Sequence, residues 1–242
     1  IPLMLIFSQP DLKNTITVVI LICIMLYLAG LSYKIIGGAI LIIVPLVVVF
    51  LFIVVQPNQK LIKDYQRDRI MTFLHSEEEE YSDDVIQQNN SVMAIGSGQL
   101  TGKGLNNNEV ASANKGNFVS ESQTDFIFSA ITEEMGVIYA LCLILICVSC
   151  YVMFLNIAME LRNNFYKLIA LGLGTCYIFQ VFLQIGGVTK FIPSTGMTLP
   201  FVSYGGSSML STMIMFGIIQ GLYIIREDEE EEREKEKLRK ER

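Results

Sequence analysis

The feature that most constrains this chain is the uneven distribution of its charges. Residues 15–55 contain the single charged residue Lys34, and residues 136–159 and 197–225 contain none. Apolar stretches of this length are typical of helices that cross a membrane, because about 20 helical residues span the hydrocarbon core. Charged residues make up 17% of the chain, below the roughly 25% that is usual in soluble domains. The sequence therefore argues against an ordinary cytosolic enzyme.

We predict five membrane-spanning helices, so the expected fold class is an all-α, polytopic membrane helix bundle. The predicted spans cover residues 15–31, 35–55, 126–155, 168–188 and 207–225. Residues 1–14 are too short to cross a bilayer alone, and they are interpreted as the end of a truncated helix followed by an outer loop. Residues 15–55 then hold two spans, and residues 125–225 hold three.

The charges of the short loops predict how these spans are oriented. The positively charged residues of two short loops and of the start of the tail are Lys34, Arg162, Lys167 and Arg226. All lie on one side of the predicted bundle, which the positive-inside rule makes cytoplasmic. Residues 56–124 then form one large extracytoplasmic loop, and residues 189–206 form an outer, re-entrant-like loop. Lys190 in this second loop is a positive charge on the outer side, which runs against the positive-inside rule.

The C-terminal tail, residues 226–242, contains nine acidic and seven basic residues. A segment with so few apolar residues cannot bury a core. We expect a charged cytoplasmic tail that either continues the last helix or is disordered, with a docking tail as the alternative.

Charge and histidine content exclude two classes of function. The net charge is −6, which argues against nucleic-acid binding, because that depends on basic surfaces. His75 is the only histidine, so a metal site built from several histidines is excluded.

Acidic residues at the start of the third predicted span are the first candidates for chemistry. Asp125 lies where the polar loop meets the apolar helix, and either Ser122 or Thr124 is expected to cap that helix. Glu133 follows eight residues later. Eight residues turn a helix by about 800°, which is two full turns plus about 80°, so both side chains lie on the same side of the helix. Acidic side chains at membrane depth are costly and mark function by default. The alternative is a structural ion pair or a water-filled crevice.

Two further segments are rich in turn-forming residues. Residues 96–104, GSGQLTGKG, match neither nucleotide-binding glycine motif, so they are interpreted either as a plain flexible loop or as backbone through which Lys103 approaches a phosphate. Residues 193–208, PSTGMTLPFVSYGGSS, lie between two spans. Irregular backbone at membrane level is tolerated where it lines a cavity, so we predict a re-entrant or cavity-lining element, with a surface turn as the alternative.

Several of these segments together resemble the RodA/FtsW/SpoVE family, the shape, elongation, division and sporulation proteins. The motifs that carry the resemblance are QPDL at 9–12, YQRDRI at 65–70, AIGSGQLTGKG at 94–104, TDFIF at 124–128 with the following EE and G, and PSTGMTLPFVSYGGSS at 193–208. The resemblance covers essentially the whole chain. It implies that the chain corresponds to the C-terminal half of a family member, in the bacterial plasma membrane with several spans.

The resemblance implies a peptidoglycan glycosyltransferase that polymerises lipid II on the outer face of the membrane, for cell shape, division or sporulation. The family's catalytic aspartate maps to Asp125, with the expected role of general base on the acceptor hydroxyl. Lys103, Arg67 and Arg69 are expected to bind the substrate as cations that face the leaving diphosphate. The other residues expected to bind substrate are Glu133, Ser203, Gly205, Gly206 and Ser207. No cofactor is implied with certainty, and a divalent cation, Mg²⁺ or Mn²⁺, is left open.

The expected partners are membrane lipid, the lipid II substrate and a class B penicillin-binding protein, which cross-links the new strand. Two other functions remain open: a transporter of the lipid-linked precursor, and a non-catalytic scaffold for a penicillin-binding protein. The sequence also departs from the family pattern: Gln184 stands where an asparagine is common, and Lys190 where an uncharged residue is common.

Overall fold

The computed structural model contains helices and loops, and no strands, in the part of the chain that it describes. The described residues are 12–32, 34–35, 37–38, 41, 45, 83–105, 122–192 and 196–241. Their helices are α2 (Leu12–Leu28), α5 (Asp83–Gly98), α6 (Ile127–Glu160), α7 (Asn164–Val188) and α8 (Gly206–Glu241). This confirms the all-α fold class. The predicted span at 35–55 lies outside the described residues, except for a few positions. The YQRDRI motif also lies outside them, and of the QPDL motif only Leu12 is described.

The chain divides into two compact units, residues 1–86 and 87–242. In the first unit, α2 contains an apolar segment, Val18–Leu28. The helix ends at Leu28, and Gly30, two residues further on, has a φ of +90°. The N–H of Gly30 donates to the Tyr27 carbonyl (3.0 Å) and that of Leu31 to the Leu26 carbonyl (3.1 Å), the arrangement that a glycine-terminated helix adopts.

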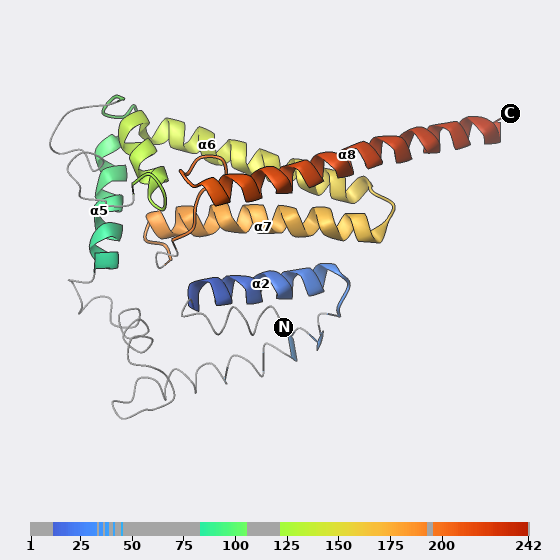
Figure 1. The fold of residues 1–242 in the computed structure, drawn as a ribbon, viewed down its shortest axis with the longest axis horizontal. Coiled ribbons are helices and arrows are strands. Elements are labelled where there is room, and N and C mark those ends of the chain that lie inside the picture. The colour runs from blue at the N-terminus through green and yellow to red at the C-terminus, as the bar shows by residue number, and fades with distance from the viewer. Residues whose placement is uncertain are drawn as a thin grey trace. The chain divides into compact units, whose positions relative to one another are not determined.

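Among the described residues, the helices that are long and apolar enough to cross a membrane are α6, α7 and α8, all in the second unit. Figure 1 shows them side by side, with α6 and α7 joined by a tight turn. At this turn, the Asn163 side chain accepts a hydrogen bond from the Phe165 N–H (2.9 Å) and caps α7. Large apolar side chains of α6 face outward at Ile138, Tyr139, Leu141, Leu145, Ile146, Val148, Val152, Met153 and Met159. These surfaces suit lipid, and the chain is a helical membrane protein.

An aromatic cluster joins the three long helices. Phe154 of α6 packs edge-on against Tyr177 of α7, with ring centroids 5.7 Å apart, and against Phe216 of α8 at 5.0 Å. Phe201, which precedes α8, meets Phe216 at 4.7 Å. Edge-to-face contacts of this kind are favourable beyond the area that they bury, so the cluster sets how the three helices pack.

The start of the second unit is fastened to the end of α7 by side chains of α5. The Gln88 amide donates to the carbonyls of Gly187 (2.7 Å) and Ile192 (2.8 Å). Ser91 Oγ donates to the Val188 carbonyl (3.0 Å). Lys190 has a positive φ of +60° just beyond α7, and its ammonium group donates to Asn89 Oδ1 (2.9 Å).

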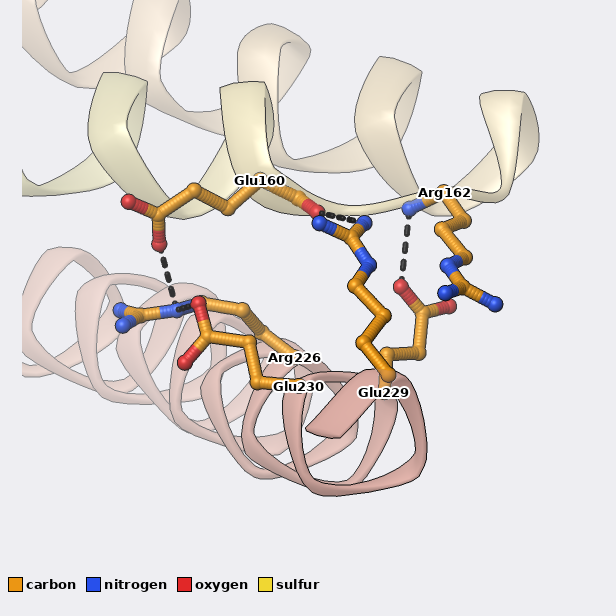
Figure 2. A network of polar contacts seen from close by, with 6 residues as sticks. Glu160, Arg162, Arg226, Glu229 and Glu230 are labelled. Carbon is orange, nitrogen blue, oxygen red and sulfur yellow. Dashed lines mark hydrogen bonds and ion pairs between the residues drawn. The ribbon is translucent and has the colours of Figure 1, made fainter. Parts of the chain in front are cut away.

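At the other end of the bundle, charged side chains tie the extension of α8 to the turn between α6 and α7 (Figure 2). Arg226 Nε bridges Glu160 Oε2 and Glu230 Oε1, and the Arg162 N–H donates to Glu229 Oε2 (2.8 Å). Arg233 donates to the Glu160 carbonyl (3.2 Å). The charged tail therefore continues the last helix, which was one of the two expected alternatives.

Candidate functional site

A break in α6 shapes the region around the predicted site. Gly136 has φ +86° and ψ 168°, which interrupts the helix. The loop after α5 fills the interruption with four main-chain hydrogen bonds. These run from the N–H of Val137 to the Gln99 carbonyl (2.9 Å), Ile138 to Leu100 (3.4 Å), Lys103 to Glu133 (2.9 Å) and Gly104 to Glu134 (3.0 Å). The loop thus supplies partners that the continuous helix would otherwise have provided.

Three glycines allow this loop and α6 to approach so closely. A Cβ atom on Gly98 would lie 2.1 Å from the Thr132 carbonyl oxygen, and one on Gly102 would lie 2.2 Å from that of Glu134. A Cβ atom on Gly136 would lie 2.3 Å from the Leu100 carbonyl oxygen. All three distances are impossible for a real side chain. The glycine-rich segment is therefore a packed element at residues 98–104, which corrects its interpretation as a plain flexible loop.

The packed loop brings together two of the predicted substrate-binding residues, Lys103 and Glu133. Lys103 Nζ lies 2.7 Å from Glu133 Oε1, and the side chains are 20% and 1% exposed. An ion pair here offsets the large cost of burying the Glu133 carboxylate. The structural ion pair considered for Glu133 is thus present.

Asp125, the predicted catalytic residue, lies two residues before Ile127, the first residue of α6. Phe126 occupies the cap position and makes no side-chain capping hydrogen bond, so neither Ser122 nor Thr124 is the N-cap residue that was expected. The Asp125 side chain is partly exposed. The start of a helix carries partial positive charge, which favours a carboxylate.

The loop before α8 approaches the Asp125 carboxylate closely. Gly196 has φ +65°, and a Cβ atom there would lie 3.2 Å from Asp125 Oδ2. A side chain at this position would thus be strained and would crowd the carboxylate.

Ser203 anchors the same loop to the segment that carries Asp125. Its hydroxyl donates to the Thr124 carbonyl (2.8 Å) and accepts from the Leu199 N–H (2.7 Å). The Tyr204 N–H donates to the Gln123 carbonyl (2.9 Å). The buried Ser203 therefore acts on the position of Asp125 through the main chain.

The other predicted residues of this loop lie at the start of α8. Gly206 is its first residue, and Ser207 is exposed, with its carbonyl accepting a hydrogen bond from Ser211 Oγ (2.7 Å). Gly205 lies beside Ser208. A substrate contact by Gly205, Gly206 or Ser207 stays a prediction, and Arg67 and Arg69 lie outside the described residues.

A shallow pocket lies beside Asp125. Its described lining residues are Asp125, Leu183, Gln184, Gly187, Val188, Gly196 and Met197. Gln184 was not among the predicted site residues, although its position was noted as a departure from the family pattern. The signal was an amide within an apolar span, four residues before its end, because polar groups inside a membrane are costly. Gln184 Nε2 donates to the Asp125 main-chain carbonyl (3.1 Å).

The described part of the chain contains no group of three or more His, Cys, Asp or Glu side chains able to hold a metal ion. Whether a divalent cation takes part stays a prediction.

Comparison with known proteins assigns the family. The family model FTSW_RODA_SPOVE, described as "Cell cycle protein", matches residues 1–227. This chain belongs to the FtsW/RodA/SpoVE family. The TDFIF motif with Asp125 and the loop that packs against it lie within the matched residues.

Two curated members of the FtsW/RodA/SpoVE family illustrate the similarity. The "Peptidoglycan glycosyltransferase MrdB" of Escherichia coli (strain K12) is 34% identical over 224 residues, which are 92% of this chain and 57% of that protein. The "Probable peptidoglycan glycosyltransferase FtsW" of Lactococcus lactis is 31% identical over 231 residues, 93% of this chain and 53% of that protein. The chain spans somewhat more than half the length of these relatives.

A solved structure shares the fold of this family member. It is described as "Structural coordination of polymerization and crosslinking by a peptidoglycan synthase complex", and it matches with a TM-score of 0.72 at 22% identity. The match covers 93% of this chain and 59% of that one.

Proposed function

We propose that this protein is a peptidoglycan glycosyltransferase that polymerises lipid II at the outer face of the bacterial plasma membrane. The observation that carries the proposal is the position of Asp125, in a pocket at the start of α6 between Gln184 and Gly196. The family membership supports it, as do the names of the relatives that cover most of this chain.

In the proposed reaction, Asp125 is the general base. Its carboxylate takes the proton of the acceptor sugar hydroxyl while that oxygen attacks the anomeric carbon of the donor sugar. A new glycosidic C–O bond forms, and the bond from the anomeric carbon to the lipid diphosphate breaks. The diphosphate leaves with the bonding electron pair. The partial exposure of Asp125 leaves its carboxylate within reach of a sugar from outside the bundle.

Lys103, Arg67 and Arg69 are proposed to stabilise the leaving diphosphate, because cations lower the energy of developing negative charge. Lys103 is 20% exposed and paired with Glu133. Glu133 therefore contributes to this role by holding the lysine in place.

We also propose that the protein works with a class B penicillin-binding protein that cross-links the new glycan. The support is the solved neighbour, described as a complex that coordinates polymerisation and crosslinking. Outward-facing apolar side chains along α6 suit a single membrane-spanning helix as well as lipid.

The test uses a chimera in which this chain replaces the matching part of E. coli MrdB. The purified chimera, a class B penicillin-binding protein and Mg²⁺ are incubated with labelled lipid II, and glycan ladders are separated by electrophoresis. We expect ladders from the unaltered chimera and none from the Asp125→Asn variant. An Asp228→Asn variant, altered at an exposed acid of the α8 extension, is the matched control and should keep its activity.

Glycan ladders from the Asp125→Asn variant would show that Asp125 is not the general base. Absence of ladders from the unaltered chimera, with partner binding retained, would instead support the scaffold.

The second candidate is transport of the lipid-linked precursor, which the break in α6 favours, because transporters often bind substrate at interrupted helices. Against it, the main-chain groups of Glu133, Glu134, Val137 and Ile138 at this break are bonded to the loop after α5, so they are not offered to a ligand. Movement of lipid II between the leaflets of proteoliposomes by the Asp125→Asn variant would support the transporter.

A further inference from the structure

Gln184 presents a buried hydrogen-bond acceptor that the fold does not use. The side chain lies in α7 and is 2% exposed. Its Nε2 donates to the Asp125 carbonyl (3.1 Å), but Oε1 has no hydrogen-bond partner in the described part of the chain. A buried acceptor without a partner is costly, so its retention calls for an explanation.

The unused oxygen belongs to the pocket of Asp125. Gln184 and Asp125 are both among the residues that line it, and the other described lining residues have apolar side chains or are glycines. The carboxylate and the amide are therefore the polar side-chain groups of the described lining. An ionised carboxylate only accepts hydrogen bonds, and the free atom of the amide is also an acceptor. The polar atom of this lining that lacks a partner is Gln184 Oε1, so a ligand that satisfies it must bring a hydrogen-bond donor.

We propose that Gln184 Oε1 accepts a hydrogen bond from the acceptor sugar and so orients the sugar beside Asp125. This inference rests on the proposed function and deepens it. The donor is a hydroxyl or acetamido N–H group next to the reacting hydroxyl. The same lining disfavours the lipid diphosphate, whose ionised oxygens accept hydrogen bonds and are repelled by a carboxylate. On this proposal, the pocket beside Asp125 and Gln184 binds the sugar end of lipid II.

Gln88 provides the comparison that separates this role from a structural one. It is buried to a similar degree, 7% exposed, and its Nε2 likewise donates to main-chain carbonyls. It is not among the described lining residues of the pocket. Loss of the Gln88 amide therefore removes anchoring hydrogen bonds without removing an acceptor from the sugar site.

The experiment compares Gln184→Met with Gln88→Met in the MrdB chimera. Methionine keeps the approximate length and volume of glutamine without its amide. We measure the KM and kcat for lipid II and the thermal midpoint of each variant. Gln184→Met should raise the KM about tenfold, the equivalent of one lost hydrogen bond, with a smaller effect on kcat. Gln88→Met should lower the thermal midpoint and leave the KM within about twofold.

A second measurement identifies the donor. Lipid II analogues that each lack one hydroxyl next to the reacting one are used as acceptors. The analogue that lacks the donor should bind the unaltered chimera about tenfold more weakly and should bind Gln184→Met no more weakly than lipid II does. An analogue in which the acetamido nitrogen is methylated tests the N–H in the same way.

Three outcomes would overturn the inference. One is an unchanged KM in Gln184→Met, and another is a KM change that Gln88→Met reproduces. The third is an equal penalty for every analogue in the unaltered chimera and in Gln184→Met. An unaltered chimera without ladders would overturn the proposed function as well, so the two failures are distinguishable.

Discussion

Lys103 Nζ lies 2.7 Å from Oε1 of Glu133, a residue 30 positions further along the chain whose side chain is 1% exposed. This pair joins the loop after α5 to the first part of α6. The main-chain hydrogen bonds at the break in α6 connect the same two segments. The described part of the loop, residues 99–105, is therefore held by both its backbone and the Lys103 side chain, and the segment that follows Asp125 is held with it.

Replacement of Lys103 by methionine should destabilise the protein, because it removes the positive charge that is paired with the buried Glu133 carboxylate. We expect a loss of about 3 kcal/mol, seen as a lower thermal midpoint in detergent. The double variant Lys103→Met with Glu133→Gln should recover most of this loss. Lys235→Met is the control, since Lys235 and Glu231 form a pair that is 69% and 70% exposed, and its midpoint should not move. A single variant as stable as the unaltered protein would contradict the prediction.

Alanine at Gly136 should detach the loop from α6. The φ of +86° is unfavourable for alanine, and the new Cβ atom would clash with the Leu100 carbonyl oxygen. A loss of about 3 kcal/mol is expected, with faster hydrogen exchange at the Val137 and Lys103 amides. Gly217→Ala is the matched control, because no atom lies within 4 Å of the added Cβ and the effect should stay below about 1 kcal/mol. Equal effects of the two substitutions would show that the close approach does not matter.

Removal of the Ser203 hydroxyl should move the segment that carries Asp125. Ser203→Ala leaves the Leu199 N–H and the Thr124 carbonyl without this partner, and the expected cost is about 1–3 kcal/mol. Polymerisation by the chimera should fall by a larger factor than the folded fraction does. Ser211→Ala is the control, because that exposed hydroxyl bonds only within α8. Normal polymerisation by Ser203→Ala would rule out this positioning role.

The polar network between the extension of α8 and the turn that joins α6 to α7 should determine how readily a protease reaches the charged extension. Glu160→Gln weakens the bridge to Arg226 (Figure 2), and we expect trypsin to cleave near Arg233 about twofold faster, in line with the small energies of exposed ion pairs. High salt should have the same effect on the unaltered protein. Glu231→Gln, which loses only a contact within α8, should leave the cleavage rate unchanged. A rate insensitive to both salt and Glu160→Gln would contradict the prediction.

Hydropathy was sufficient to predict the long helices. The charge-free stretch at 136–159 lies within α6, and residues 206–225 of the stretch at 197–225 lie within α8, because a membrane selects apolar helices by composition and length. The ordered motifs were sufficient to predict the family. The break at Gly136 was not predicted, because the apolar pattern continues through it and the cause lies in another segment, the loop that supplies its hydrogen bonds.

The sequence by itself therefore determined the fold class, the family and the position of Asp125 at the start of a helix. Only the tertiary structure decided that Lys103 pairs with Glu133, that glycines pack the loop against α6, and that Gln184 faces the pocket of Asp125. The physical reason is that hydropathy and motifs are properties of neighbouring residues. A buried ion pair, a close backbone approach and an unused acceptor each depend on residues that are distant in the chain and meet only when the helices pack.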